Sequence, residues 1–536
     1  MSRNYFNKQY PRRKLRRNAF DLSQEKKLSF KIGELVPILC EEVVPGDSFR
    51  LNTEIFLRMA PMLAPVMHRV NVFTHYFFVP HRLVWNNGED DSWEAFIRPH
   101  NKIEEMPVFP KISSDKGLFE DFFRLGSLAD YLGIPPLSIL HTGFSVSALP
   151  FRAYTLIYNE YYRDQDLQDE IPIGLSGGLL EREEFENYIL RNRNWEKDYF
   201  TSARPTAQAG VDVLIPGLGG DGTVVYDPDG RESGVYPRFE QIGQGTMSSS
   251  VSSLRAGTGA VFKDVSSSSV SNLNRVAYDP AGTLKVEGEG SAGTINELRR
   301  AVRLQEWKER AMRGGKRYTE LLYHMFGVRS SDARIQRPEY LGGGKSPVQI
   351  SEVLQTSATE SDSPQGAMAG HGVSVGNTHQ FKRFFEEHGY VIGIMSVLPR
   401  TTYQDGIPRH FNKYDPFDYF WPEFAQIGEQ PVYNREIYGL FSPDPGGVFG
   451  YQSRYCEYKF GTSTVHGDFR DTLSFWHMGR QFSGPPGLNG DFVTAKPEEV
   501  SRIFAVEEGP EDHLYCQLYH NLQAIRPMPV FGTPVL

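Results

Sequence analysis

The chain has 536 residues, of which 39% are hydrophobic and 23% charged, and its 57 basic and 66 acidic residues give a net charge of −9. This apolar content suffices for a substantial core, and no run of about 18 apolar residues indicates a membrane-spanning helix. The three cysteines, Cys40, Cys456 and Cys516, lie too far apart for a disulfide framework or a zinc ribbon, so reducing surroundings are expected. The polar, basic N-terminus lacks the apolar segment of a secretory signal.

The first twenty residues form a basic arm without a single acidic residue. Its charges are Arg3, Lys8, Arg12, Arg13, Lys14, Arg16 and Arg17. Without these seven, 50 basic residues face 66 acidic ones, so the rest of the chain has a balance of −16. Tyr5, Phe6 and Tyr10 stand among the cations, a mixture that suits stacking on unpaired bases. The arm is therefore predicted to be extended and to bind a polyanion; a solubilising tail or a nuclear-localisation signal is the alternative.

Residues 35–85 are predicted to be β-structure. Leu35–Cys40 is apolar, a turn follows at Pro45–Asp47, and Ser48–Leu57 resumes an extended pattern. Val70–Val79 is largely apolar on both faces, which indicates a strand buried on both sides, and Pro80 ends it. The high content of Gly, Pro and aromatic residues also favours many short strands joined by turns.

Helices and loops are expected over residues 90–170, with a helix at Ala153–Leu167. Residues 211–293 are rich in Gly, Ser and Thr and read as an inserted segment of short strands and loops. The clearest helix is Thr294–Arg313, because Thr294 and Glu297 form a capping box. A second helix is predicted at Thr319–Phe326, ending at Gly327.

Strands return at Tyr390–Val397 and at Tyr451–Phe460. Strand candidates near both ends of the chain favour one β-sandwich with large insertions over separate domains. The predicted organisation is a basic arm (1–20), a first part of the sandwich with helical and loop insertions (21–210), a surface insertion (211–293), and a last part with helices, the remaining strands and a C-terminal extension (294–536).

Several short motifs lack the context that their chemistry needs. Gly217–Gly222 matches a dinucleotide-binding pattern, but the strand-like Thr223–Tyr226 follows where a helix is required. Gly174–Gly178 matches a nucleophile elbow without the buried strand before it. Gly344–Ser346 resembles the end of a phosphate-binding loop without its first glycine, so the Gly342–Gly344 run is read as a hinge or tight loop.

The histidines do not indicate a site either. His68, His75 and His81 lie close in sequence without metal-ligand spacing on a helix, so they are expected to be structural. We therefore predict no catalytic constellation, no cofactor and no metal site.

Nine blocks of the sequence, in order along the chain, resemble the major capsid proteins of microviruses, small icosahedral single-stranded DNA phages, and most closely the gokushovirus branch. They are Phe20–Phe30, Val36–Phe49, Ala60–Val72, His75–Pro80, Leu149–Tyr154, Asn296–Arg300, Arg337–Gly344, Glu387–Gly393 and Gly447–Gln452. The resemblance extends from about residue 20 to about residue 480. Ser202–Ala207 departs from the family pattern, and residues 211–293 do not align with it.

The resemblance implies a mainly β fold, an eight-stranded antiparallel jelly roll with long inserted loops and some helices. About sixty copies would close into a T=1 icosahedral shell around circular single-stranded DNA. The insertion 211–293 would form a protrusion, at threefold axes, with a possible role in host attachment; a spacer is the alternative. Scaffolding and other structural phage proteins would be further partners, in a virion assembled in the bacterial cytoplasm without membrane insertion.

Within this picture the arm faces the packaged DNA. The residues predicted to bind it are Arg12, Arg13, Lys14, Arg16 and Arg17. Two other classes of protein could use an aromatic-rich β-sandwich: a carbohydrate-active enzyme or lectin, which would need no basic arm, and a phage fibre, which would show sequence repeats.

Overall fold

The computed structural model describes 16–98, 106–113, 122–136, 144–211, 213, 223–226, 239–241, 254–256, 262–264, 276–278, 284–287, 294–354, 356, 368–440, 444, 446–506 and 511–531. It divides into two compact units, residues 1–207 with 311–536, and residues 208–310. Within the described part of the chain, none of the helices combines the length and the apolar character needed to cross a membrane.

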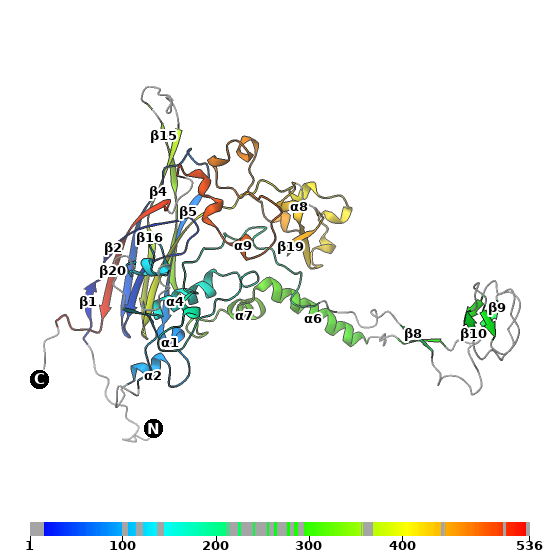
Figure 1. The fold of residues 1–536 in the computed structure, drawn as a ribbon, viewed down its shortest axis with the longest axis horizontal. Helices are drawn as coiled ribbons and strands as arrows, with labels where there is room; N and C mark the ends of the chain where they lie inside the picture. Colours follow the sequence, from blue (N-terminus) through cyan, green and yellow to red (C-terminus); the bar gives the residue numbers. More distant parts are fainter. Residues whose placement is uncertain are drawn as a thin grey trace, which may run out of the picture. The chain divides into compact units, whose positions relative to one another are not determined.

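The first unit is built on two antiparallel sheets (Figure 1). The first contains β1 (Asn18–Asp21), β2 (Gln24–Phe30), β20 (Leu514–Arg526), β4 (Ser48–Met59), β16 (Met368–Phe384) and β15 (Gln349–Leu354). The second has the order β14 (Glu339–Pro347), β5 (Val70–Pro80), β17 (Gly389–Pro399) and β3 (Val36–Val43). The short strands β1 and β2 both pair with β20, each with a different part of it. They therefore lie one after the other at the edge of the first sheet.

Eight of these strands have the wiring of a jelly roll. The order β2-β20-β4-β16 in one sheet faces β3-β17-β5-β14 in the other, so the chain crosses repeatedly between the sheets. This confirms the predicted mainly β fold. Each sheet pairs strands from both ends of the chain, and the insertions between them account for the length of the unit.

The side-chain pattern of each strand matches its place in the sandwich. In β4 and β20 every second residue is buried, so these strands have one core face and one exposed face. In β5 all residues but one are buried, which confirms the prediction of a strand covered on both sides. The core between the sheets includes Phe30, Leu51, Val72 and Leu518.

A polar network crosses this core without leaving a buried group unsatisfied. The hydroxyl of Tyr76 donates to Thr53 Oγ1 at 2.6 Å, and Thr53 Oγ1 lies 2.9 Å from Nδ1 of His520. The other ring nitrogen of His520 lies 3.1 Å from the Ile38 carbonyl oxygen. Burial lowers the pKa of His520 to about 4, so its imidazole stays neutral at physiological pH. The histidine is structural, as we expected for histidines of this chain.

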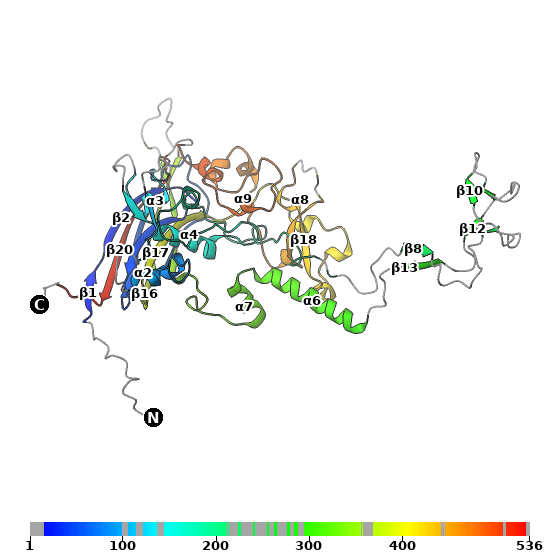
Figure 2. The same cartoon turned by 60° about the horizontal axis from the view of Figure 1, so that its bottom comes forward.

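Short helices cover the outer face of the second sheet (Figures 1 and 2). They are α1 (His81–Val84), α2 (Trp93–Ile97), α3 (Leu128–Leu132) and α4 (Leu149–Ile157). Phe77 and Ile392 of the sheet pack there with Trp85 and Tyr154 in a second hydrophobic cluster. The helix predicted at Ala153–Leu167 starts earlier, at Leu149, and Pro150 lies in its first turn. After Ile157 it continues as a π-helical turn, Tyr158–Tyr162.

Two sequence predictions were wrong. The Gly342–Gly344 run is no hinge: it lies inside β14, beside a β-bulge between Tyr340 and Gly342. A Cβ at Gly343 would come within 2.2 Å of the Thr74 carbonyl oxygen, so glycine is needed for close approach to β5. The strand predicted at Tyr451–Phe460 ends early, because Tyr455 turns the chain with a φ of 59°.

The remaining elements of the first unit are short. They are β6 (Lys111–Ser113) paired with β7 (Ser145–Ser147), β18 (Glu429–Tyr433) paired with β19 (Val448–Ser453), α5 (Arg182–Phe185), α7 (Tyr318–Phe326), α8 (Asn434–Ile437) and α9 (Gly490–Val493). Single 3₁₀ turns lie at Arg409–Phe411, Pro416–Asp418, Pro422–Phe424, Cys456–Tyr458, Gly467–Arg470, Ser474–Trp476, Pro497–Glu499 and Ser501–Ile503. The αL residue Gly327 ends α7, as predicted.

The second unit contains three nested strand pairs. They are β8 (Thr223–Tyr226) with β13 (Leu284–Glu287), β9 (Phe239–Gln241) with β12 (Val276–Tyr278), and β10 (Leu254–Ala256) with β11 (Phe262–Asp264). Because β8 is a strand, the dinucleotide pattern before it lacks its helix, as expected. Most of α6 (Ile295–Gly314) also belongs here, and its capping box is confirmed: Thr294 N–H donates to Glu297 Oε2 at 2.8 Å, and Glu297 N–H to Thr294 Oγ1 at 3.2 Å.

Candidate nucleic-acid and assembly surfaces

The basic arm enters the fold along β20. Of the five residues predicted to bind DNA, Arg12, Arg13 and Lys14 lie outside the described residues, whereas Arg16 and Arg17 are described and exposed. Arg17 Nη2 donates to the carbonyl oxygens of Gly46 and Ile525, and its guanidinium lies 5.4 Å from the ring centroid of Phe384. Arg17 therefore also anchors the start of β1 to the sandwich.

The exposed face of the first sheet is a second candidate surface for nucleic acid. The outward positions of β1, β2, β4, β16 and β20 and the residue before β1 carry more basic than acidic side chains: Arg17, Lys27, Arg50, Arg58 and Lys382 against Asp21, Glu25 and Glu54. Aromatic rings stand among them: Phe56, Tyr515 and Tyr519 are all exposed. Cations and rings on one surface suit contact with single-stranded nucleic acid. Sequence reasoning missed this face, because register brings its strands together from both ends of the chain.

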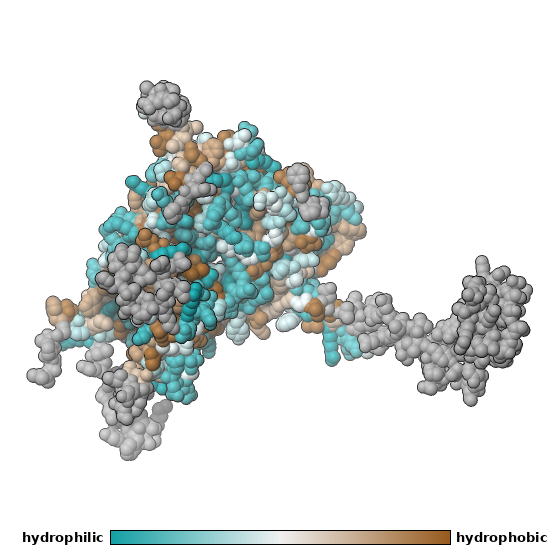
Figure 3. All heavy atoms as spheres, viewed as in Figure 1, coloured by the Kyte–Doolittle hydropathy of each residue, from teal (hydrophilic) through white to brown (hydrophobic). Residues whose placement is uncertain are grey.

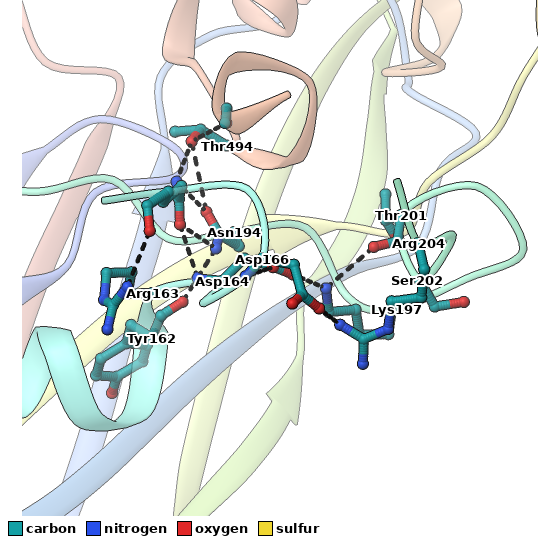
Figure 4. Close-up of polar contacts among 12 residues, drawn as sticks. Tyr162, Arg163, Asp164, Asp166, Asn194, Lys197, Thr201, Ser202, Arg204 and Thr494 are labelled. Atoms are coloured by element: carbon teal, nitrogen blue, oxygen red, sulfur yellow. Dashed lines mark hydrogen bonds and ion pairs between the residues drawn. The ribbon is translucent and has the colours of Figure 1, made fainter. Parts of the chain in front are cut away.

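A cavity of about 790 Å³ lies in the first unit beside the outer face of the second sheet. Seven cations line it: Arg163, Arg193, Lys197, Arg204, Lys316, Arg317 and Arg337. The loops around it converge on Asp164 and Asp166, which are almost fully buried (Figure 4). Asp164 pairs with Lys197, and Asp166 with both Arg204 and Lys316, the latter at 2.8 Å.

The acidic side chains that line this cavity are held in ion pairs. Its other acidic residues are also ion-paired: Glu196 with Lys345 at 2.9 Å, Glu320 with Arg317 at 3.3 Å and Asp332 with Arg337 at 2.7 Å. Each carboxylate that lines the cavity thus has a cation as its partner.

The same loops are tied across the sequence by neutral hydrogen bonds. Gln168 Nε2 donates to Thr494 Oγ1 at 2.9 Å, and Asn194 Nδ2 donates to the Tyr162 carbonyl oxygen at 3.0 Å (Figure 4). Across the described residues, no group of three or more His, Cys, Asp or Glu side chains could hold a metal ion. Ion pairs and hydrogen bonds thus join the segments that line this cavity.

Comparison with known proteins identifies the family. A family model described as capsid protein (F protein) matches residues 9–536. The chain belongs to this capsid protein family. It is 35% identical to the capsid protein VP1 of Chlamydia phage 1, with 98% of this chain and 96% of the relative covered. It is 36% identical to the VP1 of Bdellovibrio phage phiMH2K, with 97% of this chain and 95% of the relative covered. It is 29% identical to the VP1 of Spiroplasma virus 4, with 95% of this chain and 93% of the relative covered.

The microvirus resemblance is thus confirmed, and the chain is a structural capsid protein of a phage virion, not an enzyme. The segment Ser202–Ala207, which departs from the family pattern, has defined contacts in this capsid protein. Arg204 forms the ion pair with Asp166, and its backbone N–H donates to the Tyr451 carbonyl oxygen at 2.9 Å. Sequence spacing gave no signal for this pair, because 38 residues separate the two partners.

Proposed function

We propose that about sixty copies of this capsid protein close into a T=1 icosahedral shell around circular single-stranded DNA. The observation that carries the proposal is the jelly-roll unit itself. It forms a rigid sandwich, yet its loops and strand faces expose many large apolar side chains, among them Met67, Leu125, Phe411 and Phe531. Monomers rarely expose contiguous apolar patches larger than a few hundred Å², whereas a subunit that is surrounded by copies of itself buries such patches.

The DNA would be held on the side of the basic arm. Arg12, Arg13, Lys14 and Arg16 would neutralise phosphates, and Arg17 would do so next to its anchoring contacts on the sandwich. The exposed face of the first sheet supports this orientation, because its cations and rings continue the chemistry of the arm. Binding would be tolerant of sequence, since both phosphate contacts and ring stacking are. Scaffolding and other structural phage proteins would assist assembly in the bacterial cytoplasm.

Particle formation tests the shell. Co-expression of the chain with its neighbouring phage genes should yield closed, uniform particles in negative-stain microscopy, and these should sediment as a single species. Their measured mass should correspond to about sixty subunits, as the smallest closed icosahedral arrangement requires. A population that stays monomeric or forms only small oligomers, with all neighbouring genes present, would contradict the proposal.

For residues 211–293 we propose a protrusion at threefold axes that contacts the host surface. Its Gly- and Ser-rich sequence suits adaptable hydrogen bonding to a receptor. A variant that lacks residues 217–290 should still assemble, because the jelly-roll strands all lie outside this segment. Its particles should adsorb to host cells much less than wild-type particles in a sedimentation assay. If they adsorb equally well, the segment is a spacer.

A further inference from the structure

Exposed aromatic side chains are dense in the loops near α8. Figure 1 shows the backbone of these loops, and in Figure 3 their surface mixes hydrophobic and hydrophilic colours. Residues 405–429 contribute six of them: Phe411, Tyr414, Phe417, Tyr419, Phe420 and Trp421. Tyr458 and Phe460 add two more from the segment after β19. Their exposed fractions range from 48% for Trp421 to 78% for Tyr414. We call these eight side chains the aromatic platform.

The loop that carries the platform is held in place by its own hydrogen bonds. The backbone N–H groups of Tyr414 and Asp415 both donate to Asp418 Oδ2 at 3.0 Å, and that of Phe417 donates to Asp415 Oδ1 at 2.9 Å. Trp421 Nε1 donates to the Pro416 carbonyl oxygen, also at 2.9 Å. The rings are therefore presented in a fixed arrangement, which lowers the entropy lost on binding.

Part of the platform lines a hollow of about 540 Å³, whose walls also include the charged side chains of Arg409, Lys413, Glu436 and Glu457. Phe411, Tyr419, Tyr458 and Phe460 are among its walls, and the Lys413 ammonium lies 4.0 Å from the ring centroid of Tyr458. A hollow with aromatic walls is the kind of pocket into which a protein partner inserts an anchoring side chain. The platform thus offers a pocket for one anchoring side chain and, around that pocket, a wider apolar surface.

The size of the platform matches an interface. An aromatic side chain has roughly 200 Å² of surface, so eight rings exposed to this degree present on the order of 900 Å². The largest apolar patch of a typical monomer covers only about 300–600 Å². A stable protein–protein interface buries about 800 Å² on each partner. The platform alone therefore offers the area that one such contact needs.

Its charge gives no preference for nucleic acid as the partner. The two segments that carry and contact the platform, residues 405–435 and 454–460, contain six acidic side chains, Asp405, Asp415, Asp418, Glu423, Glu429 and Glu457, and five basic ones, Arg409, Lys413, Arg435, Arg454 and Lys459. This near balance lacks the excess of cations that binding to phosphates requires, so the charge of the platform does not favour packaged DNA as its partner. Aromatic residues are also the side chains that protein interfaces enrich.

We propose that the aromatic platform is an interface with a second copy of this chain. Every copy in a particle exposes the same platform, so the partner must be equally abundant, and another copy of the chain satisfies this condition by symmetry. The facing surface on that copy must supply a side chain that fills the hollow. The inference rests on the proposed shell and names one of its contacts.

The test compares two double variants in the co-expression system. In Tyr414→Ser/Phe417→Ser both exposed rings are lost, whereas in Tyr414→Phe/Phe417→Tyr both rings remain and only a hydroxyl moves. The serine variant should form about tenfold fewer particles by sedimentation, because rings at an interface core carry much of the binding energy. The ring-preserving variant should assemble like the wild type. Both should unfold at the wild-type temperature, since both side chains are exposed.

Equal assembly of the serine variant and the wild type would overturn the inference. If the wild type itself forms no particles, the proposed shell fails instead. A photo-crosslinking residue in place of Tyr414 keeps the test valid should the serine variant fold poorly. In assembled particles it should give a product of twice the subunit mass. Crosslinks to DNA or to another virion protein alone would overturn the inference as well.

Discussion

Replacing Arg12, Arg13, Lys14, Arg16 and Arg17 with alanine should remove most of the salt dependence of single-stranded DNA binding. Each phosphate contact on a single strand contributes about −0.7 to the slope of log K against log salt concentration. Seven contacts of the arm give a slope of about −5, and the two cations that remain, Arg3 and Lys8, give about −1.4. Fluorescence anisotropy of a labelled oligonucleotide over a salt series measures both slopes.

A matched control replaces five cations of α6 with alanine, four of them exposed and one, Lys308, half-buried. These are Arg299, Arg300, Arg303, Lys308 and Arg310, so the net charge changes by the same amount. If the arm is the DNA-binding element, this control should keep a slope near −5. The same loss of slope in both variants would mean that overall charge, and not the arm, sets the affinity, and an unchanged slope in the arm variant would exclude the arm.

The contacts of Arg17 call for a second variant. Because Arg17 anchors β1 through Gly46, Ile525 and Phe384, its replacement can loosen the sheet as well as remove a phosphate contact. The variant in which only Arg12, Arg13, Lys14 and Arg16 are replaced keeps that anchor. Its expected slope is about −2.1, with the thermal stability of the wild type. Comparison of the two variants separates DNA binding from anchoring.

Local patterns predicted the elements that local forces decide. The apolar run Val70–Val79 and the capping box of Thr294 and Glu297 were recognised because each signal lies within a few neighbouring residues. The jelly-roll fold, by contrast, was implied by resemblance to a family. Its pairing of β2 with β20 joins residues about 490 positions apart, and no short-range pattern specifies such a register.

The predictions that were wrong or missing have the same cause: they depend on contacts between residues that are far apart in the sequence. The Gly342–Gly344 run looks like a hinge in isolation, and only the close approach of Thr74 on β5 explains it as strand. The aromatic platform was not recognised either, because a sequence rich in Phe, Tyr and Trp does not distinguish buried rings from exposed ones. Ion pairs such as Asp166 with Arg204 depend on two loops that meet only in the folded chain.

Arg152 also makes contacts that the sequence did not predict, and its replacement has the largest expected effect on stability. The side chain lies in α4, within the family block Leu149–Tyr154, and is fully buried. Its Nη2 pairs with Glu184 Oε1 at 2.7 Å and donates to the Ser176 carbonyl oxygen at 2.9 Å, while Nη1 donates to the Val84 carbonyl oxygen at 3.2 Å. One guanidinium thus joins α4 to the end of α1, to the loop Gly174–Gly178 and to α5.

Arg152→Ala should lower the free energy of unfolding by about 3–5 kcal/mol, because it leaves the largely buried Glu184 carboxylate without its cation and two carbonyl oxygens without this donor, although the Tyr188 hydroxyl still donates to Glu184 Oε1 at 2.9 Å. Urea unfolding of the unassembled subunit measures this loss. Arg182→Ala is the matched control: Arg182, the first residue of α5, pairs with Glu186 just after that helix, but both side chains are about half exposed, so its removal should cost less than about 0.5 kcal/mol.

A second replacement distinguishes a missing donor from a missing side-chain volume. In Arg152→Met/Glu184→Leu the charged pair is exchanged for apolar groups of similar size, which often restores stability when a buried ion pair is removed as a whole. This variant should recover part of the loss, though not all of it, because the carbonyl oxygens of Val84 and Ser176 still lack a donor. If the free energies of unfolding of Arg152→Ala and Arg182→Ala lie within 1 kcal/mol of each other, the buried ion pair contributes no more to stability than the exposed one.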